Sequence, residues 1–249
     1  MLAAEAFPAI EELRLSCIDY INENQPTTLD YIDRKRELRI IGFRPSRIAP
    51  NRQRVQASRI IKDLRDALDQ ATFQASKRLN PAGKNSTYFP FCRDPDDFKT
   101  LFDPKKGRSR DIPERLRPFL LGLEPYPTLA GRTGGNDLLR ALGYVAGPNK
   151  HQTTLRVAPD LPGFMIQELM NRGLGAMESG FMKHGSDLEI VRASIGANIV
   201  WKFTVSFYLA FEAPSQLANG PAAAVLGDLA RIVQRVVLGI EAETNRLLG

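Results

Sequence analysis

The strongest periodic pattern of apolar and polar positions lies between residues 51 and 79. Its apolar residues fall within one arc of a helical wheel at about 100° per residue, and charged residues fill most of the remainder. The pattern predicts a long helix that begins at an Asn51 cap and ends before residues 80–83. The residues of the apolar arc are Ile60, Ile61, Leu64, Ala67, Leu68, Ala71 and Ala75.

Phe73 lies among the charged residues on the other face of this helix. A bulky apolar group at such a position indicates that a second element or a second subunit covers part of the face. The charged face is therefore expected to form a site or a dimer contact.

Further patterns predict four more helices and two groups of strands. Alternating residues with a charged turn predict a β-hairpin at 29–44, and strands are expected at 173–178, 188–195 and 198–211. The other expected helices span about 9–23, 113–123, 136–146 and 222–248.

Helices bracket the β segments, and strands do not alternate with helices along the chain. This order predicts an α+β fold with a helical bundle as its core, and it argues against a parallel doubly wound sheet. The long helix near Arg65 and the final helix are the expected bundle partners. We expect one domain over residues 1–249, with β-hairpin insertions near 29–44 and 173–211.

Composition narrows the class of protein. The chain has 249 residues, a formal net charge of +6 and a pI of about 9.4, which favour an anionic partner such as nucleic acid. Cys17 and Cys92 lack metal-ligand spacing and are expected to be reduced thiols. No run of about 18 apolar residues and no export signal is evident, so we expect a cytoplasmic protein without a membrane contact.

Four segments carry a resemblance: 64–70 (Leu-Arg-Asp-Ala-Leu-Asp-Gln), 89–91 (Phe-Pro-Phe), 112–126 and 149–151 (Asn-Lys-His). Their order and spacing resemble those of an uncharacterised bacterial family. In that family the long helix reads His-Asn-Leu-Arg-Ser-Ala-Leu-Asp-His, and a downstream helix ends in Asp-Lys-His-Arg. The arrangement also resembles HEPN domains, helical bundles that commonly dimerise and often act as metal-independent ribonucleases. The resemblance implies a HEPN-like helical bundle with appended antiparallel β-hairpins.

The HEPN signature is an arginine followed, four to six residues later, by a histidine. Arg65 matches the arginine, whereas Gln70 stands where the family has histidine. Lys62 and Asp63 replace the family's His-Asn pair, and Gln152 replaces the arginine after His151. The resemblance implies that the arginine binds phosphate and the histidine exchanges a proton. Glutamine cannot exchange a proton near neutral pH. Since a general acid or base typically raises the reaction rate about 10²–10⁴-fold, most of that contribution would be lost.

His151 is the remaining candidate for acid–base chemistry, with Arg65 as its catalytic partner. Beside Lys150, just past a predicted helix end, it could meet a phosphate, or it could cap the helix C-terminus. His184 is expected in a solvated turn. Two histidines so placed do not indicate a metal site, and no cofactor is expected.

Other side chains are candidates for the cleft or for nucleic-acid binding. Arg65 and Asp69 are spaced for an i,i+4 ion pair, which is equally a plain surface contact. An arginine-rich hairpin could follow a phosphate backbone, or could simply protect an edge strand from aggregation. A second basic run, 105–110, lies in a loop. The binding candidates are Asp69, Gln70, Lys62, Lys150, Arg36, Arg39 and Arg44.

The resemblance implies an RNA- or nucleotide-binding protein of a bacterial defence or toxin–antitoxin system. It would be a homodimer with weakened or absent nuclease activity. Two alternatives stay open. One is an active metal-independent ribonuclease that uses Arg65 and His151, and the other is a non-catalytic scaffold that holds a protein partner in the same groove.

Overall fold

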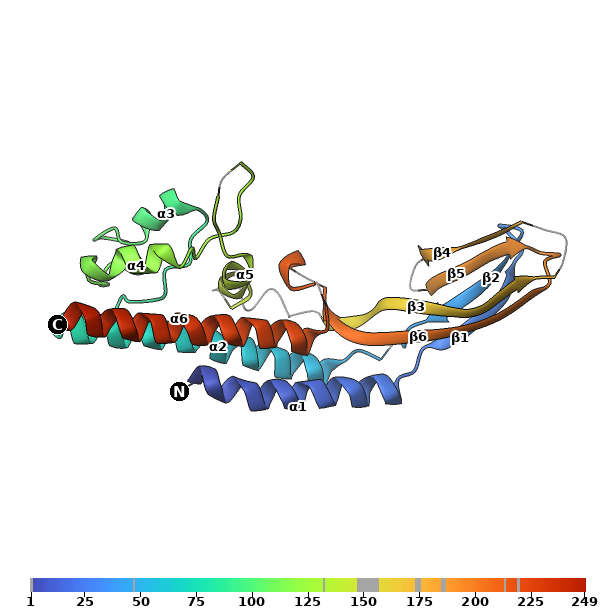
Figure 1. Ribbon diagram of the computed structural model, residues 1–249, viewed down its shortest axis with the longest axis horizontal. Coiled ribbons are helices and arrows are strands. Elements are labelled where there is room, and N and C mark those ends of the chain that lie inside the picture. The colour runs from blue at the N-terminus through green and yellow to red at the C-terminus, as the bar shows by residue number, and fades with distance from the viewer. Residues whose placement is uncertain are drawn as a thin grey trace. The chain divides into compact units, whose positions relative to one another are not determined.

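The computed structural model describes residues 2–46, 48–131, 133–146, 157–172, 176–184, 187–212, 214–218 and 220–249 (Figure 1). Helices and strands are both present, which confirms the α+β class. Contacts divide the chain into two compact units. The helical unit comprises Met1–Leu15, Asn51–Val157 and Ala210–Gly249, and the sheet unit comprises Ser16–Pro50 and Ala158–Leu209. The expectation of one domain stays a prediction, as does the HEPN-like character of the bundle.

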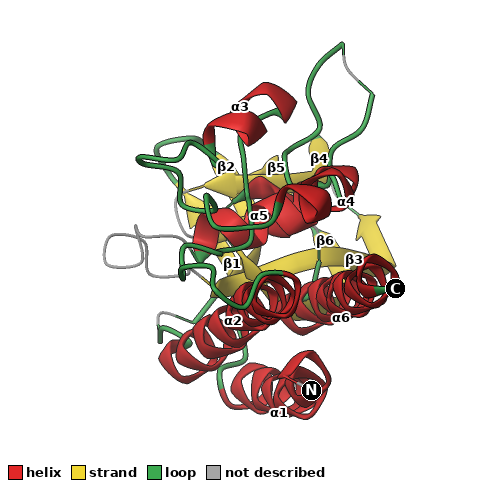
Figure 2. Cartoon of the chain, turned by 90° about the vertical axis from the view of Figure 1, so that its left-hand side faces the viewer, coloured by secondary structure: helices red, strands yellow, loops and turns green. Residues whose placement is uncertain are grey.

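Two long helices form the base of the helical unit. Helix α2 (Asn51–Leu79) and helix α6 (Ala222–Leu248) have the predicted bounds and lie side by side in both ribbon views (Figures 1 and 2). They run in the same direction, because Arg115 donates to the carbonyl groups of both Leu79 and Leu247, at the two C-terminal ends. The predicted pairing of these helices is confirmed.

Shorter helices cover this pair. Helix α4 (Arg117–Gly122), which follows a 3₁₀ turn at Glu114–Leu116, packs on α6, and helix α5 (Asp137–Val145) packs on both α2 and α6. Asn136 caps α5 through a hydrogen bond from the Leu139 amide. Helix α3 (Pro95–Thr100) was not expected, because prolines usually break helices. Here Pro95 lies at the first turn, where its missing N–H costs little.

The sheet unit contains a four-stranded antiparallel sheet in the order β1-β2-β5-β4. The strands are β1 (Thr27–Asp33), β2 (Leu38–Arg44), β4 (Met177–His184) and β5 (Asp187–Ser194). The hairpin predicted at 29–44 is confirmed. Strands β3 (Val157–Asn171) and β6 (Ile199–Phe211) form a separate two-stranded sheet.

Two predicted boundaries were wrong, and one strand was not predicted. Helix α1 (Leu2–Glu23) begins before Pro8, which lies inside it. The strand expected at 173–178 overlaps β4 only at its start. His184 is the last residue of β4 and pairs with Asp187 of β5, so the two strands form the hairpin expected there. No strand was expected at β3, whose sequence contains two prolines. Since β3 pairs with β6 alone, it is an edge strand, where a missing N–H is tolerated.

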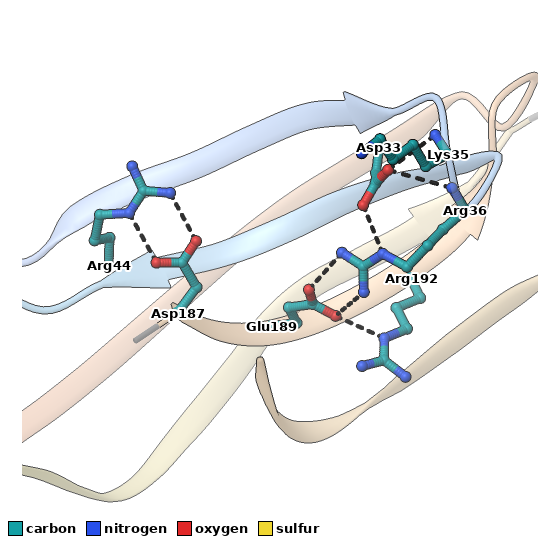
Figure 3. Close-up of polar contacts among 7 residues, drawn as sticks. All are labelled: Asp33, Lys35, Arg36, Arg44, Asp187, Glu189 and Arg192. Atoms are coloured by element: carbon teal, nitrogen blue, oxygen red, sulfur yellow. Dashed lines mark hydrogen bonds and ion pairs between the residues drawn. The ribbon is translucent and has the colours of Figure 1, made fainter. Parts of the chain in front are cut away.

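A buried carboxylate organises the four-stranded sheet. Glu189 on β5 is fully buried and accepts hydrogen bonds from Arg36 at 2.7 Å and Arg192 at 2.7 Å (Figure 3). Arg36, in the turn that joins β1 to β2, also donates to Asp33 at the end of β1. Burial by itself raises the pKa of Glu189, but the two arginines outweigh it and hold that pKa below its ordinary value. The network therefore favours the ionised form and ties the β1–β2 hairpin to β5.

We predict that Glu189→Gln lowers the free energy of unfolding by about 2–3 kcal/mol. The change removes the described anion of Arg192 and one of the two anions of Arg36, and both guanidinium groups are half-buried. Urea denaturation at neutral pH measures the loss, and Glu178→Gln at an exposed position of β4 is the matched control. The pKa of Glu189 is lower in the folded state than its ordinary value. The difference in free energy of unfolding between the wild type and the variant is therefore fully present above the ordinary glutamate pKa, and it decreases as the pH falls through the pKa of the folded state. Equal stability of the two variants at pH 7 would contradict the assignment.

Candidate functional site

A pocket of about 610 Å³ opens on the helical unit. Its lining comes from α2, from the loop around residues 88–93, from residues 97–109 and from α5. Four arginines face three aspartates in the lining: Arg65, Arg93, Arg108 and Arg140, with Asp66, Asp69 and Asp97. We call it the arginine pocket.

Arg65 is held by two neighbours, one of which is itself anchored by the backbone. Its Nε donates to the Asp69 carboxylate at 3.0 Å, and its guanidinium lies over the Phe91 ring, 4.2 Å from the centroid. The second oxygen of Asp69 accepts the Phe89 backbone N–H at 2.8 Å. The predicted Arg65–Asp69 pair is confirmed, and its side chains are only 15% and 22% exposed, so it is more than a surface contact.

The loop that carries Phe89 and Phe91 is anchored on both sides. The two rings meet edge to face with centroids 4.8 Å apart, and the Ser109 hydroxyl donates to the Tyr88 carbonyl at 2.7 Å. Phe91 also packs directly against Gly143 of α5, where a Cβ atom would lie 2.5 Å from the ring. The wall of the pocket is therefore a packed structure.

Arg140, on α5, is half-buried, and among the described residues its guanidinium has no hydrogen bond or ion pair. Burial is the largest cause and lowers the pKa of Arg140 from its ordinary value. The charges of Arg108 and Arg65 act in the same direction, whereas Cys92 and the Asp97 carboxylate oppose it. An arginine still stays protonated at physiological pH. Arg108 is exposed and likewise has no described partner, whereas Arg93 pairs with Asp97 at 3.2 Å. The arrangement leaves two cations in the pocket that an anion could neutralise.

Cys92 also lines the pocket, but its chemistry is different. The thiol is buried, and burial raises its pKa to about 12. It is therefore protonated at neutral pH and is a poor nucleophile.

A smaller pocket of about 330 Å³ adjoins the first and shares Asp66, Asp69 and Tyr88 with it. Gln70 lies here, so Arg65 and Gln70 border neighbouring pockets. Lys62 is exposed, lies 4.0 Å from Asp66 and lines neither pocket. We call the smaller pocket the amide pocket; its remaining lining residues are Phe73, Asn85 and Thr87.

The three hairpin arginines expected to bind nucleic acid belong to the sheet unit, and each is engaged by a carboxylate. Arg36 binds Glu189 and Asp33, Arg39 binds Asp30 through two bonds of 2.9 Å, and Arg44 binds Asp187 through two bonds of 2.7 Å. Figure 3 shows the pairs of Arg36 and Arg44. These ion pairs explain the arginines as parts of the sheet, and a role in nucleic-acid binding stays a prediction.

His151 and Lys150 lie outside the described residues, so their expected place beside Arg65 stays a prediction. His184 is exposed at the end of β4. Within the ranges that the structure describes, no group of His, Cys, Asp and Glu side chains could hold a metal ion.

Sequence reasoning identified Arg65, Asp69 and Gln70 but missed Arg140, Tyr88 and Tyr144. Arg140 was not predicted because it lies on the polar side of a short predicted helix, where an arginine does not by itself indicate a binding site. Its position next to two leucines gave no signal of a pocket. The proximity of α5 to the 88–93 loop is tertiary and has no local pattern.

Comparisons with models of protein families, with curated proteins and with solved structures found no match to this chain. Of the helices described, none has both the length and the apolar character needed to cross a membrane.

We predict that Gly143→Ala destabilises the helical unit by about 1–3 kcal/mol, because the new methyl group collides with the Phe91 ring. Gly227→Ala in α6 is the control, since its Cβ would meet nothing closer than 3.9 Å and the change should raise stability by about 0.5–1 kcal/mol. Urea denaturation followed by circular dichroism compares them. A Gly143 variant as stable as the Gly227 variant would show that Phe91 does not pack as described.

Proposed function

We propose that this protein binds RNA or a nucleotide through the arginine pocket, as a HEPN-like protein with little or no nuclease activity. The observation that carries the proposal is Arg140, a half-buried cation without a described partner, beside the unpaired Arg108. A half-buried charge is costly unless an anion meets it. Phosphate suits the planar fork of an arginine, which can donate two parallel hydrogen bonds to it.

The aromatic residues of the pocket favour a nucleotide over inorganic phosphate. Tyr88 and Tyr144 line the pocket and are 55% and 59% exposed, so their rings are accessible to a ligand. Exposed rings beside arginines bind bases by stacking while the cations hold the phosphate backbone. Arg65 supplies a third cation, already oriented by Asp69 and Phe91.

Binding is favoured over cleavage because proton exchange lacks an obvious group. Gln70 occupies the signature position, and the described lining of the two pockets contains no histidine. Hydrogen bonding by glutamine supports recognition but supplies no general acid or base near neutral pH.

We predict that Arg140→Gln weakens binding of a labelled single-stranded RNA by about tenfold or more, the effect of one lost charge-assisted hydrogen bond. Fluorescence anisotropy at several salt concentrations measures it, and the variant should also show a shallower salt dependence. Arg246→Gln is the control, because that arginine is exposed on α6 and pairs with Glu243 at 2.7 Å. The proposal fails if wild-type affinity for RNA and for nucleotides is absent, or if both variants bind equally well.

We predict no cleavage of end-labelled RNA by the wild-type protein in EDTA, over a range of protein concentrations. The assay includes Arg65→Ala and His151→Ala, so that any activity can be assigned. Cleavage by the wild type that disappears in either variant would overturn this prediction. It would establish the active, metal-independent ribonuclease with a rearranged site.

A further inference from the structure

The amide pocket differs in charge from the arginine pocket beside it. Its lining includes Asp66 and Asp69 but no lysine or arginine. A phosphate would be repelled there, whereas a neutral group with hydrogen-bond donors would be attracted. A ligand with an anionic part and a donor-bearing part could therefore occupy the two pockets together, across the residues that they share.

The amide pocket also has aromatic and amide groups suited to a flat ring. Phe73 is half-buried, with the Lys77 ammonium 5.9 Å from its ring centroid, and Tyr88 is exposed. Gln70 and Asn85 provide amide groups that both donate and accept. The unexpected place of Phe73 on the charged face of α2 is explained if its ring forms part of a binding wall. Stacking surfaces together with polar edges are what proteins use to hold an unpaired base.

The two carboxylates of the amide pocket are not equivalent. Asp69 already accepts hydrogen bonds on both oxygens, from Arg65 and from the Phe89 backbone N–H. Asp66 has only a 4.0 Å ion pair to exposed Lys62 among its described contacts, and it lines both pockets. Asp66 is therefore the carboxylate that can accept from a ligand.

We propose that the amide pocket is a nucleobase subsite that selects guanine, with Asp66 as the residue that determines specificity. This inference rests on the proposed function, since the phosphate of the same ligand lies in the arginine pocket. Guanine alone among the four bases presents two adjacent donors, N1–H and the N2 amino group, to one carboxylate. Adenine and cytosine offer a single amino group there, and uracil offers one N–H between two carbonyl groups.

The test is competition against a labelled single-stranded RNA by four compounds: GMP, IMP, AMP and ribose 5-phosphate. IMP keeps the N1–H of GMP but lacks its amino group, so it isolates one hydrogen bond to the carboxylate. We expect GMP to bind about tenfold more tightly than IMP or AMP, the effect of a single bond to a charged acceptor.

Asp66→Asn should bring the ratio of GMP to IMP affinity close to one, because an amide offers one acceptor where the carboxylate offers two. Affinity for ribose 5-phosphate should not fall, since the change removes a negative charge near the phosphate. Asp63→Asn is the matched control, with the same charge change on the same helix at a position that lines neither pocket. That variant should keep the wild-type preference.

The outcomes separate the two proposals. Absence of binding by RNA and by all four compounds would overturn the proposed function together with the base subsite. Binding of nucleotides with equal affinity for GMP, IMP and AMP would overturn the base subsite alone. The same holds if Asp66→Asn keeps the preference for GMP over IMP.

Discussion

The candidate site depends on the two hydrogen bonds that the Asp69 carboxylate accepts. One comes from Arg65, one turn earlier on α2, and the other from the backbone of Phe89 in the loop that follows that helix. The carboxylate thereby fixes the direction of a cation and the position of a wall at the same time. Phe91 connects this arrangement to α5, because its ring lies under the Arg65 guanidinium and packs against Gly143. Asp69 is thus one of the three residues that the two pockets share, together with Asp66 and Tyr88.

The arginines of the chain fall into two groups by their partners. Arg36, Arg39 and Arg44 of the β1–β2 hairpin meet carboxylates of the same sheet, and the buried Glu189 requires such cations because an isolated buried charge is unfavourable. Arg108 and Arg140 have no described carboxylate partner. Basic composition alone does not distinguish these roles. The number of arginines in a segment is therefore a weaker guide to binding than the pairing of each one.

The fold could be predicted where one periodicity persisted over many residues. Helices α2 and α6 have the bounds expected from their apolar stripes, and the β1–β2 hairpin follows from alternation around a charged turn. Strand β3 was missed because its prolines indicate a break, and only its place at the edge of a two-stranded sheet makes them acceptable. Local patterns do not report which edges remain unpaired.

The site was predictable only on α2, because Arg65, Asp69 and Gln70 are neighbours on a single helix. Tyr88, Arg140 and Tyr144 join them through tertiary packing of a loop and of α5, for which no spacing rule exists.

If the proposed function is correct, Gln70 gives this position a role in hydrogen bonding in place of the proton exchange that a histidine would provide. A histidine at this position would contribute a proton acceptor, whereas glutamine contributes a donor and an acceptor that do not titrate. In a pocket that also holds Asn85 and Asp66, such a group adds to the recognition of a polar ring edge. The glutamine at position 70 then accounts both for the absence of proton exchange and for the additional hydrogen bonds to the ligand. A site that holds a nucleotide without cleaving it needs the arginine for the phosphate and has no need of the histidine.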